Sequence, residues 1–343
     1  MRVAAGAAPL AWRWRKAGSL AILTYHRVLP VNSPTRLTEQ PGMYVSPETL
    51  DLHLTEITRH FELVDLADWL GRSRRGESLP RLACAITFDD GWRDNHDYAL
   101  PLLVKHGAPA TVFLVSKYIG TAYRFWPNRL MSLLRTAFED PGAVAFPDRL
   151  RTIVDPVISA ARARGELRAE DADLAVQRAK ALDEATIRGL IDATVVVNEQ
   201  SSGVRDILDR EEIGRMAGTG LVRFGSHTAT HFRLAGALSP ADLEREIIEP
   251  RRTLQALTGQ GVDLFCYPNG DTSATAIDCV RRHYLGAVTT RAGWVAGNAD
   301  PHVLPRIGVH DDATRTREGF LATISGWVYA SLDFQVGNRG QRE

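Results

Sequence analysis

Two adjacent carboxylates, Asp89 and Asp90, follow an apolar stretch of the chain and are themselves followed by Gly91. Like charges this close repel each other, so one carboxyl group tends to keep its proton unless a cation or a strong donor lies nearby. The simplest interpretation of an isolated Asp-Asp-Gly is an acidic turn that reverses the chain. The pair therefore indicates chemistry only if other residues help to bind a cation.

Two histidines four positions apart, His227 and His231, follow a second β-favouring stretch. One aspartate and two histidines suit Zn²⁺ or a similar divalent ion, and they leave coordination positions open for water and substrate. Asp90 would bind the ion, and Asp89, ionised beside it, would take a proton from the bound water. By itself, the spacing of the two histidines fits packing or solvent-facing side chains equally well.

Other polar residues also stand close to the ends of β-favouring stretches. In parallel βα architectures, residues just past the strands converge on one face, where function is expected. Arg306 lies inside such a stretch, and a buried arginine needs a carboxylate partner, for which Asp89 is the candidate. His310 begins either a second acid/base pair or an ordinary polar turn. The residues just past strands are His26, Asp89, Asp90, His227, His231 and Tyr267.

The elements that must position these residues alternate between strand-like and helix-like segments. This alternation predicts an α/β fold with repeated βα units and a mostly parallel sheet. Seven or eight parallel strands in one domain are expected to close into a barrel. The predicted strands cover residues 20–25, 63–64, 82–88, 110–115, 221–224, 262–267, 286–290 and 303–309.

The alternation is interrupted over residues 121–220, which are highly charged and helical in character, with segments at 128–138, 169–182 and 185–196. We expect a helical insertion that packs outside the main domain or over its mouth. The predicted domains are an N-terminal extension over 1–19 and a barrel over 20–343 that contains this insertion.

Composition excludes some classes of function. Of 343 residues, 44% are hydrophobic, and 41 Lys and Arg balance 41 Asp and Glu, so the protein has no overall field that attracts nucleic acid. Cys84, Cys266 and Cys279 lack CxxC spacing and are expected to be reduced core residues.

The N-terminus suggests a cytoplasmic protein without a clear signal peptide or membrane-spanning helix. Only Arg2 precedes the apolar stretch, Pro9 interrupts it, and no run reaches the roughly 18 to 20 apolar residues of a spanning helix. The segment from Trp12 to Lys16 could make a peripheral membrane contact, or it could be a frayed, solvated end.

Four motifs in this order resemble the polysaccharide deacetylase family with the NodB-homology domain, carbohydrate esterase family 4. The resemblance covers about residues 20–120 and 220–312. It implies a distorted (β/α) barrel of about seven strands and a divalent ion, zinc or alternatively Co, Mn, Ni or Fe. The ion is held by Asp90, His227 and His231, with Asp89 as general base. The motifs are Tyr25-His26-Arg27-Val28, Thr87-Phe88-Asp89-Asp90-Gly91, His227-Thr228-Ala229-Thr230-His231 and Tyr267-Pro268-Asn269-Gly270.

The resemblance also implies a reaction on an N-acetylated carbohydrate. The ion polarises the acetamide carbonyl, Asp89 deprotonates the water, and the Tyr267 backbone N–H helps to hold the oxyanion. A histidine must then protonate the departing amine. His26 is preferred for this step over His310.

Two departures from the family pattern concern the general base. Cys266-Tyr267-Pro268 stands where the family has Arg-x-Pro, so the arginine that orients the base is missing there, and Arg306 is the candidate replacement. The Asp-Trp element expected after the sixth strand is not evident, and only Arg291-Ala292-Gly293-Trp294 lies nearby.

Three functions are compatible with these residues. The first is a metal-dependent N-deacetylase that acts on a polysaccharide, a lipid-linked sugar or a glycoconjugate. The second is hydrolysis of another non-peptide C–N bond, since the same polarised carbonyl is attacked. The third is a catalytically silent scaffold, against which the intact set of aspartates and histidines argues. The sequence does not specify the sugar or the oligomeric state.

Overall fold

The chain forms two compact units, seen in a computed structural model that describes residues 18–197, 205–296 and 299–326. The first unit comprises Met1–Val28, Val45–Thr121 and Ile207–Glu343, and the second comprises Leu29–Tyr44 and Ala122–Asp206. The predicted extension over 1–19 and insertion over 121–220 stay predictions. Residues 12–16, with the predicted membrane contact, lie outside the described residues.

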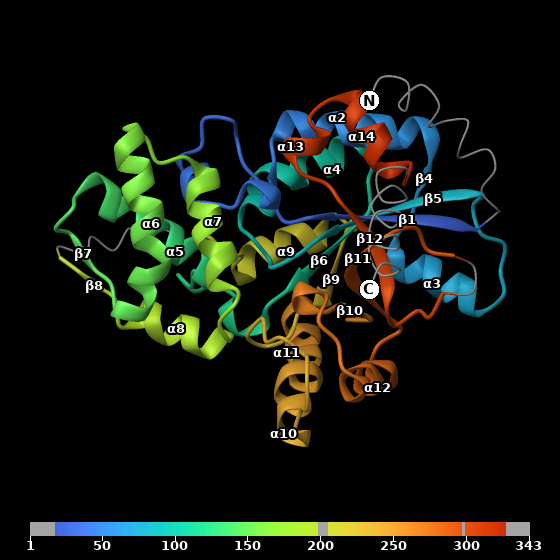
Figure 1. Cartoon of the computed structure of the whole chain (residues 1–343). Coiled ribbons are helices and arrows are strands. Elements are labelled where there is room, and N and C mark those ends of the chain that lie inside the picture. Colours follow the sequence, from blue (N-terminus) through green and yellow to red (C-terminus); the bar gives the residue numbers. More distant parts are fainter. Residues whose placement is uncertain (1–17, 198–204, 297–298, 327–343) are drawn as a thin grey trace, which may run out of the picture. The chain divides into compact units, whose positions relative to one another are not determined.

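Parallel strands in the first unit close into a barrel (Figure 1). Its strands are β1 (Ser19–Tyr25), β5 (Leu82–Phe88), β6 (Ala110–Leu114), β9 (Val222–Ser226), β10 (Leu264–Cys266), β11 (Gly286–Ala292) and β12 (Leu304–Gly308). They pair in the order β1-β12-β11-β10-β9-β6-β5, and β5 closes the ring by pairing with β1 along its whole length. The short strand β4 (Glu62–Leu63) adds to β5. The predicted fold class, a barrel of about seven strands, is confirmed.

Alternate residues of each barrel strand face opposite sides, as the two-residue period of a strand requires. In β1, Leu20 and Ile22 belong to one apolar cluster, whereas Leu23 and Tyr25 belong to another. The first cluster also contains Trp69 of helix α3 (Leu66–Arg74), so this helix closes the barrel at the amino ends of its strands.

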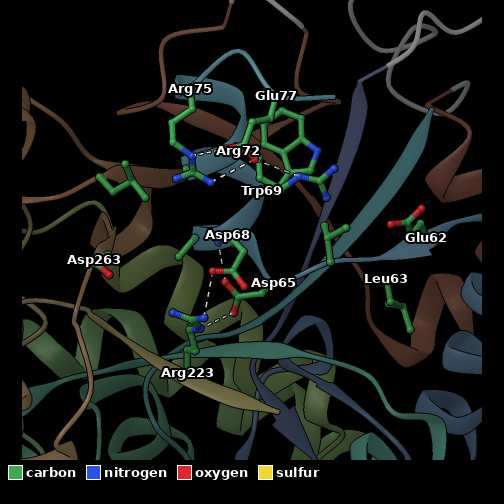
Figure 2. A pocket seen from close by; sticks show the side chains of 14 residues that line it. Glu62, Leu63, Asp65, Asp68, Trp69, Arg72, Arg75, Glu77, Arg223 and Asp263 are labelled. Carbon is green, nitrogen blue, oxygen red and sulfur yellow. Dashed lines mark hydrogen bonds and ion pairs between the residues drawn. The ribbon is translucent and has the colours of Figure 1, made fainter. Parts of the chain in front are cut away.

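Charged residues pair with one another around a pocket of about 590 Å³ beside α3 (Figure 2). Arg223 at the start of β9 lies 3.2 Å from Asp65 and 3.0 Å from Asp68. On the other side of the pocket, Arg75 pairs with Glu77. The polar residues singled out in the sequence lie past the opposite, carboxyl ends of the strands, except Arg306, which lies inside β12.

The helices of the first unit begin where the sequence provides caps. Ser46 caps the helix that starts at Pro47, and Ser239 forms a capping box with Asp242. The helical elements are α2 (Pro47–His60), the π-helical turn η3 (Asn95–Ala99), α4 (Leu100–His106), η4 (Ser116–Tyr118), α9 (Arg210–Gly218), α10 (Pro240–Leu243), the π-helical turn η5 (Glu244–Ile248), α11 (Glu249–Thr258), η6 (Pro268–Gly270), α12 (Ala274–His283), α13 (Asp311–Thr314) and α14 (Arg317–Ile324).

The sequence around residues 319–332 also predicts a closing helix. The structure has α14 in this region, and residues from 327 onward lie outside the described residues. The strands β2 (Arg27–Val28) and β3 (Tyr44–Val45) are two residues long and were not predicted.

The second unit is mostly helical and has an apolar core of its own. The segment predicted as helix over 185–196 ends at Asp192, and the β-branched pair Val195 and Val196 forms a strand instead. One helix of this unit continues through Pro156, although a proline inside a helix usually interrupts it. The elements are η1 (Pro34–Thr38), η2 (Pro41–Met43), α5 (Trp126–Glu139), β7 (Val144–Ala145), α6 (Asp148–Arg164), α7 (Ala169–Ala179), α8 (Glu184–Asp192) and β8 (Val195–Val196).

Within the described ranges, no helix has both the length and the apolar character needed to cross a membrane.

Candidate active site

The turn after β5 carries the two adjacent aspartates in a restricted backbone conformation. Asp89 still follows the strand, since its N–H donates to the carbonyl of Tyr25 at 3.0 Å. Asp90 and Gly91 both have positive φ, 72° and 74°. A Cβ at Gly91 would lie 2.7 Å from a methyl carbon of Leu114, and this contact and the positive φ together favour glycine there. The strained φ of Asp90 is a feature often found at functional sites.

Asp90, His227 and His231 converge at the carboxyl ends of β5 and β9. The Oδ1 atom of Asp90 lies 3.4 Å from Nε2 of His227 and 3.5 Å from Nε2 of His231. The two imidazole rings are 4.9 Å apart and nearly perpendicular. One donor atom from each residue lies within 4.8 Å of the others, which is close enough for a single ion. The structure thus brings together the three predicted ligands.

Hydrogen bonds with neighbouring groups engage His227 Nδ1 and Asp90 Oδ2, the atoms that do not face the centre of the site. His227 Nδ1 lies 2.8 Å from the carbonyl oxygen of Cys266, so Nδ1 carries a proton and Nε2 is the nitrogen that faces Asp90. The indole N–H of Trp92 donates to Oδ2 of Asp90 at 3.0 Å, which leaves Oδ1 facing the histidines. Such outer contacts orient ligands at metal sites. Two imidazoles and one carboxylate fit a divalent ion of the zinc type, with a position open for water.

The charge state of Asp90 suits a metal ligand. Burial raises the pKa of this carboxyl group, but the hydrogen bond from His227 and the charge of His231 lower it more strongly. The net pKa lies below the ordinary value, so Asp90 is ionised at neutral pH.

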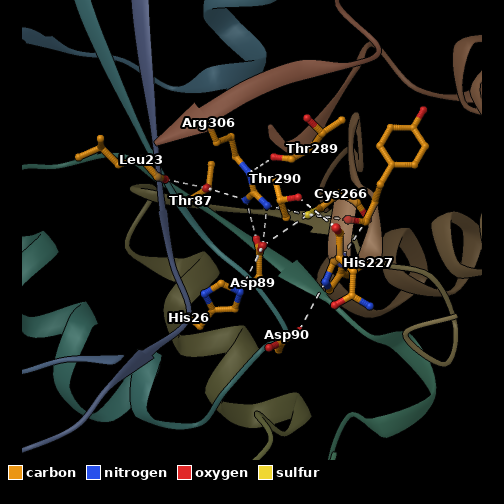
Figure 3. A network of polar contacts seen from close by, with 12 residues as sticks. Leu23, His26, Thr87, Asp89, Asp90, His227, Cys266, Thr289, Thr290 and Arg306 are labelled. Atoms are coloured by element: carbon orange, nitrogen blue, oxygen red, sulfur yellow. Dashed lines mark hydrogen bonds and ion pairs between the residues drawn. The ribbon is translucent and has the colours of Figure 1, made fainter. Parts of the chain in front are cut away.

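Asp89 is paired with Arg306 inside the barrel (Figure 3). Two hydrogen bonds join the side chains, Nη1 to Oδ1 at 2.8 Å and Nη2 to Oδ2 at 2.7 Å. The guanidinium also donates to Thr87 and to the carbonyl of Thr289, so a charge that is only 1% exposed is fully paired. The contact expected between the two side chains is therefore present.

The arginine also sets the charge of the predicted base. Burial raises the pKa of Asp89, but the charge and hydrogen bonds of Arg306 outweigh this effect and hold the pKa below its ordinary value. Asp89 is therefore ionised beside Asp90.

Cys266 contacts both Asp89 and Arg306, and this contact was not predicted from the sequence. Its sulfur lies 3.5 Å from Oδ2 of Asp89 and 3.2 Å from Nη2 of Arg306. The thiol is fully buried, as expected, but it faces the polar network rather than only the apolar core. Its place at the end of β10 was the available signal.

The two candidate acids lie in different surroundings. His26 Nε2 is 3.8 Å from Oδ2 of Asp89, and the histidine side chain is 23% exposed (Figure 3). The side-chain amide of Asn95 donates to the carbonyl of His26 at 2.8 Å and so anchors its backbone. His310 follows β12, and its Nδ1 lies 3.8 Å from Oδ2 of Asp312. This geometry favours His26.

The structure does not support the predicted oxyanion role of Tyr267. Its backbone N–H donates to the carbonyl of Val288 at 3.1 Å, because pairing between β10 and β11 continues past Cys266. Its ring packs against Phe265, with the centroids 5.1 Å apart. The backbone donor is therefore already engaged.

Sequence reasoning also missed residues that support the site. Asp94 accepts hydrogen bonds from the Arg27 side chain at 2.8 Å and from the Val28 backbone at 2.7 Å. Arg27 in turn stacks over Trp92 at 4.1 Å. The signals in the sequence were the positions of Trp92 and Asp94 shortly after the Asp pair and the position of Arg27 in the Tyr25-His26-Arg27-Val28 motif.

Comparison with known proteins is consistent with this geometry. Residues 77–156 and 179–288, more than half of the chain, match the family model described as polysaccharide deacetylase. A relative from Bacillus subtilis (strain 168), YxkH, which is provisionally named a polysaccharide deacetylase, is 54% identical over 48 residues. That match spans 14% of this chain and only 17% of the relative.

Solved structures show the same fold. The deacetylase PplD from Streptococcus pyogenes, in complex with acetate, has a TM-score of 0.58 at 18% identity and covers 89% of this chain and 98% of its own. IcaB from Ammonifex degensii has a TM-score of 0.57 at 17% identity, covering 90% of this chain and 98% of its own. At this level of identity, the likeness concerns the fold alone.

Proposed function

The chain belongs to the polysaccharide deacetylase family, and from this premise we propose that it is a metal-dependent N-deacetylase. It hydrolyses the acetamide of an N-acetylated sugar and releases acetate and a free amine. The observation that supports this proposal most directly is the convergence of Asp90, His227 and His231 beside an ionised Asp89.

A divalent ion held by Asp90, His227 and His231 would polarise the acetamide carbonyl and lower the pKa of the attacking water. The remaining steps fall to the protein. Asp89 accepts the proton of that water as it attacks the carbonyl carbon. Arg306 holds both carboxylate oxygens of Asp89, which fixes the orientation of the base and keeps it ionised.

His26 is the proposed general acid. Collapse of the tetrahedral intermediate requires a proton on the departing nitrogen, since an amine anion is a very poor leaving group. His26 lies next to Asp89, on a backbone anchored by Asn95. It is partly exposed, so it can reach a bound sugar and exchange its proton with solvent.

The substrate class is an N-acetylated carbohydrate, and the three sources to be compared are a polysaccharide, a lipid-linked sugar and a small glycoconjugate. All of them present the same acetamide to the site, so the chemistry is shared. The size of the acceptor is decided by residues around the site.

The test is to purify the protein, measure its bound metal, and assay acetate release from N-acetylglucosamine oligomers. We expect about one divalent ion per chain and acetate release that stops on Asp89→Asn. Hydrolysis of a ureide or imide, without release of acetate from the oligomers, would replace this function with hydrolysis of another C–N bond. A metal-loaded protein that turns over neither class would indicate a silent scaffold.

A further inference from the structure

A buried carboxylate, Glu246, is bonded to the loop between the two metal-binding histidines. It is 1% exposed and lies in the π-helical turn η5. Its Oε2 accepts hydrogen bonds from the backbone N–H groups of Ala229 and Thr230, both at 3.1 Å. The hydroxyl of Thr230 lies 3.1 and 3.2 Å from the two carboxylate oxygens. Glu246 is therefore the acceptor for three donors of this loop.

We propose that Glu246 is a positioning residue for the metal site: it locks the loop between His227 and His231 and so presets His231 to bind the ion. This inference rests on the proposed function insofar as the two histidines are metal ligands. Glu246 itself does not contact the ion or the substrate.

The backbone of the loop is strained on both sides of the residues that Glu246 holds. Thr228 has φ of 64° and His231 has φ of 59°, both in the left-handed region. A β-branched threonine is a rare occupant of that region. Such conformations persist only where surrounding contacts hold them in place. Without an acceptor for the two N–H groups, the chain would relax toward ordinary φ values and turn His231 away.

The opposite side of the loop is also anchored. The backbone N–H of Ser116 donates to the carbonyl of Thr228 at 3.2 Å, and that of Lys117 donates to the carbonyl of Ala229 at 3.0 Å. These bonds satisfy the loop carbonyls, whereas Glu246 satisfies the N–H groups. The loop is thus held between η4 and η5, and Glu246 is the carboxylate that accepts hydrogen bonds from its N–H groups.

A carboxylate suits this role better than an amide or an apolar group. It offers two oxygens and no donor, so every contact with backbone N–H groups is favourable. Hydrogen bonds to an ionised acceptor are about twice as strong as neutral ones. The charge is partly balanced by Arg245, whose Nε donates to Oε1 at 3.1 Å.

The π-helical geometry of η5 also supports a positioning role for Glu246. The π turn η5 separates α10 from α11, and the extra residue of a π turn changes the direction in which its side chains point. Such turns inside α-helices are frequent at functional sites. Here the turn carries the side chain that reaches the loop.

The experiment measures zinc affinity by competition with a chromophoric chelator for the wild type and for Glu246→Ala and Glu246→Gln. Loss of a residue that orients a metal ligand typically weakens metal binding by about 10- to 100-fold, which is the result expected for Glu246→Ala. Glutamine keeps one oxygen for the two N–H groups, so Glu246→Gln should bind zinc within about threefold of the wild type.

Glu244→Ala is the matched control. Glu244 lies on the same turn, but its carboxylate pairs with Arg252 at 2.8 Å and is 44% exposed, away from the loop. Zinc affinity should be unchanged in this variant. The unfolding midpoint of each zinc-free protein and the visible spectrum of its cobalt form distinguish a changed metal site from a general loss of structure.

If Glu246→Ala does not fold, Thr230→Val provides the test, because it removes only the hydroxyl contact. One lost hydrogen bond corresponds to about a fivefold weaker affinity.

Wild-type zinc affinity in Glu246→Ala would overturn the proposal. The same result in Thr230→Val would overturn it where that variant is the test. A wild-type protein that binds no metal would overturn both this proposal and the proposed function. Tight zinc binding by the wild type without acetate release, together with the predicted loss in Glu246→Ala, would support the positioning role and refute the deacetylase.

Discussion

Arg306 and Asp89 form a two-pronged ion pair in the barrel interior, with N–O distances of 2.8 and 2.7 Å, although they lie 217 residues apart. The arginine comes from β12 and the aspartate from the turn after β5. The family pattern would supply this arginine from the Arg-x-Pro motif, where the chain has Cys266. The same geometric task is therefore met here from another strand.

Removing the arginine should cost both stability and activity. In Arg306→Met, the buried carboxylate of Asp89 loses its partner, and breaking one side of a buried pair typically costs about 3–5 kcal/mol. Urea unfolding checks this value. The double variant Arg306→Met, Asp89→Asn should recover much of the loss, because no unpaired charge remains. A loss below about 1 kcal/mol in the single variant would contradict the assigned pairing.

Asp89→Asn should abolish most activity and leave the metal site intact. Asparagine has the same shape but cannot accept the proton, and a general base contributes about 10²- to 10⁴-fold to the rate. Acetate release and zinc content are measured on the same preparation. Retention of full activity would rule Asp89 out as the base, and loss of zinc would mean that it serves the metal instead.

His26→Gln and His310→Gln should differ sharply. We expect a loss of about 10²- to 10⁴-fold in kcat for His26→Gln on an acetylated sugar and a small change for His310→Gln. An activated ester such as p-nitrophenyl acetate needs no protonation of its leaving group, so the loss in His26→Gln should shrink on that substrate. The opposite ranking of the two variants would transfer the acid role to His310.

Chelation should remove activity, and zinc or cobalt should restore it while magnesium does not. Two imidazole ligands favour ions of the zinc type over magnesium, which prefers oxygen ligands. Zinc at 100 times its dissociation constant should also stabilise the fold by about 2.7 kcal/mol, seen as a higher unfolding midpoint. His231→Ala is the control, and an equal zinc-dependent shift in that variant would place the ion elsewhere.

His53 should make the fold sensitive to acid. Its Nδ1 lies 3.0 Å from the Tyr25 hydroxyl and its Nε2 lies 2.7 Å from the Thr314 carbonyl, and burial lowers the pKa of His53 from 6.5 to about 4. Between these values the unfolded chain binds a proton that the folded chain does not. Stability is therefore complete above pH 6.5 and falls by about 3 kcal/mol as the pH drops toward 4.

The measurement is the free energy of unfolding by urea at pH 7.5 and at pH 5. His53→Gln removes the titrating group, so its free energy of unfolding should differ less between pH 7.5 and pH 5 than that of the wild type. Equal acid slopes in the two proteins would show that other groups cause the loss of stability.

Local sequence was sufficient to predict the barrel and to name a candidate ligand set. The alternation of strand and helix predicts parallel strands, and parallel strands bring their carboxyl ends to one face. Asp90, His227 and His231 each follow such an end, so their meeting follows from the fold class. The chemical types of the three side chains then favour a zinc-type ion.

Side-chain pairing across the barrel was decided by the tertiary structure. The partnership of Arg306 with Asp89 could be named as a candidate but depends on the register of β12 in the closed ring. The same ring takes up the N–H of Tyr267 in pairing with Val288, which no local pattern reveals.

The hydrogen bonds that hold the loops of the site in place also depend on the tertiary structure. Two π-helical turns each present one side chain to a loop of the site: Asn95 holds the backbone of His26, and Glu246 holds the loop before His231. Hydrophobic periodicity records which face of a helix is buried, but not which polar atom a buried side chain will meet. The sequence alone therefore determined which residues are candidates for the chemistry, whereas the closed barrel and its helices decided what holds those residues in place.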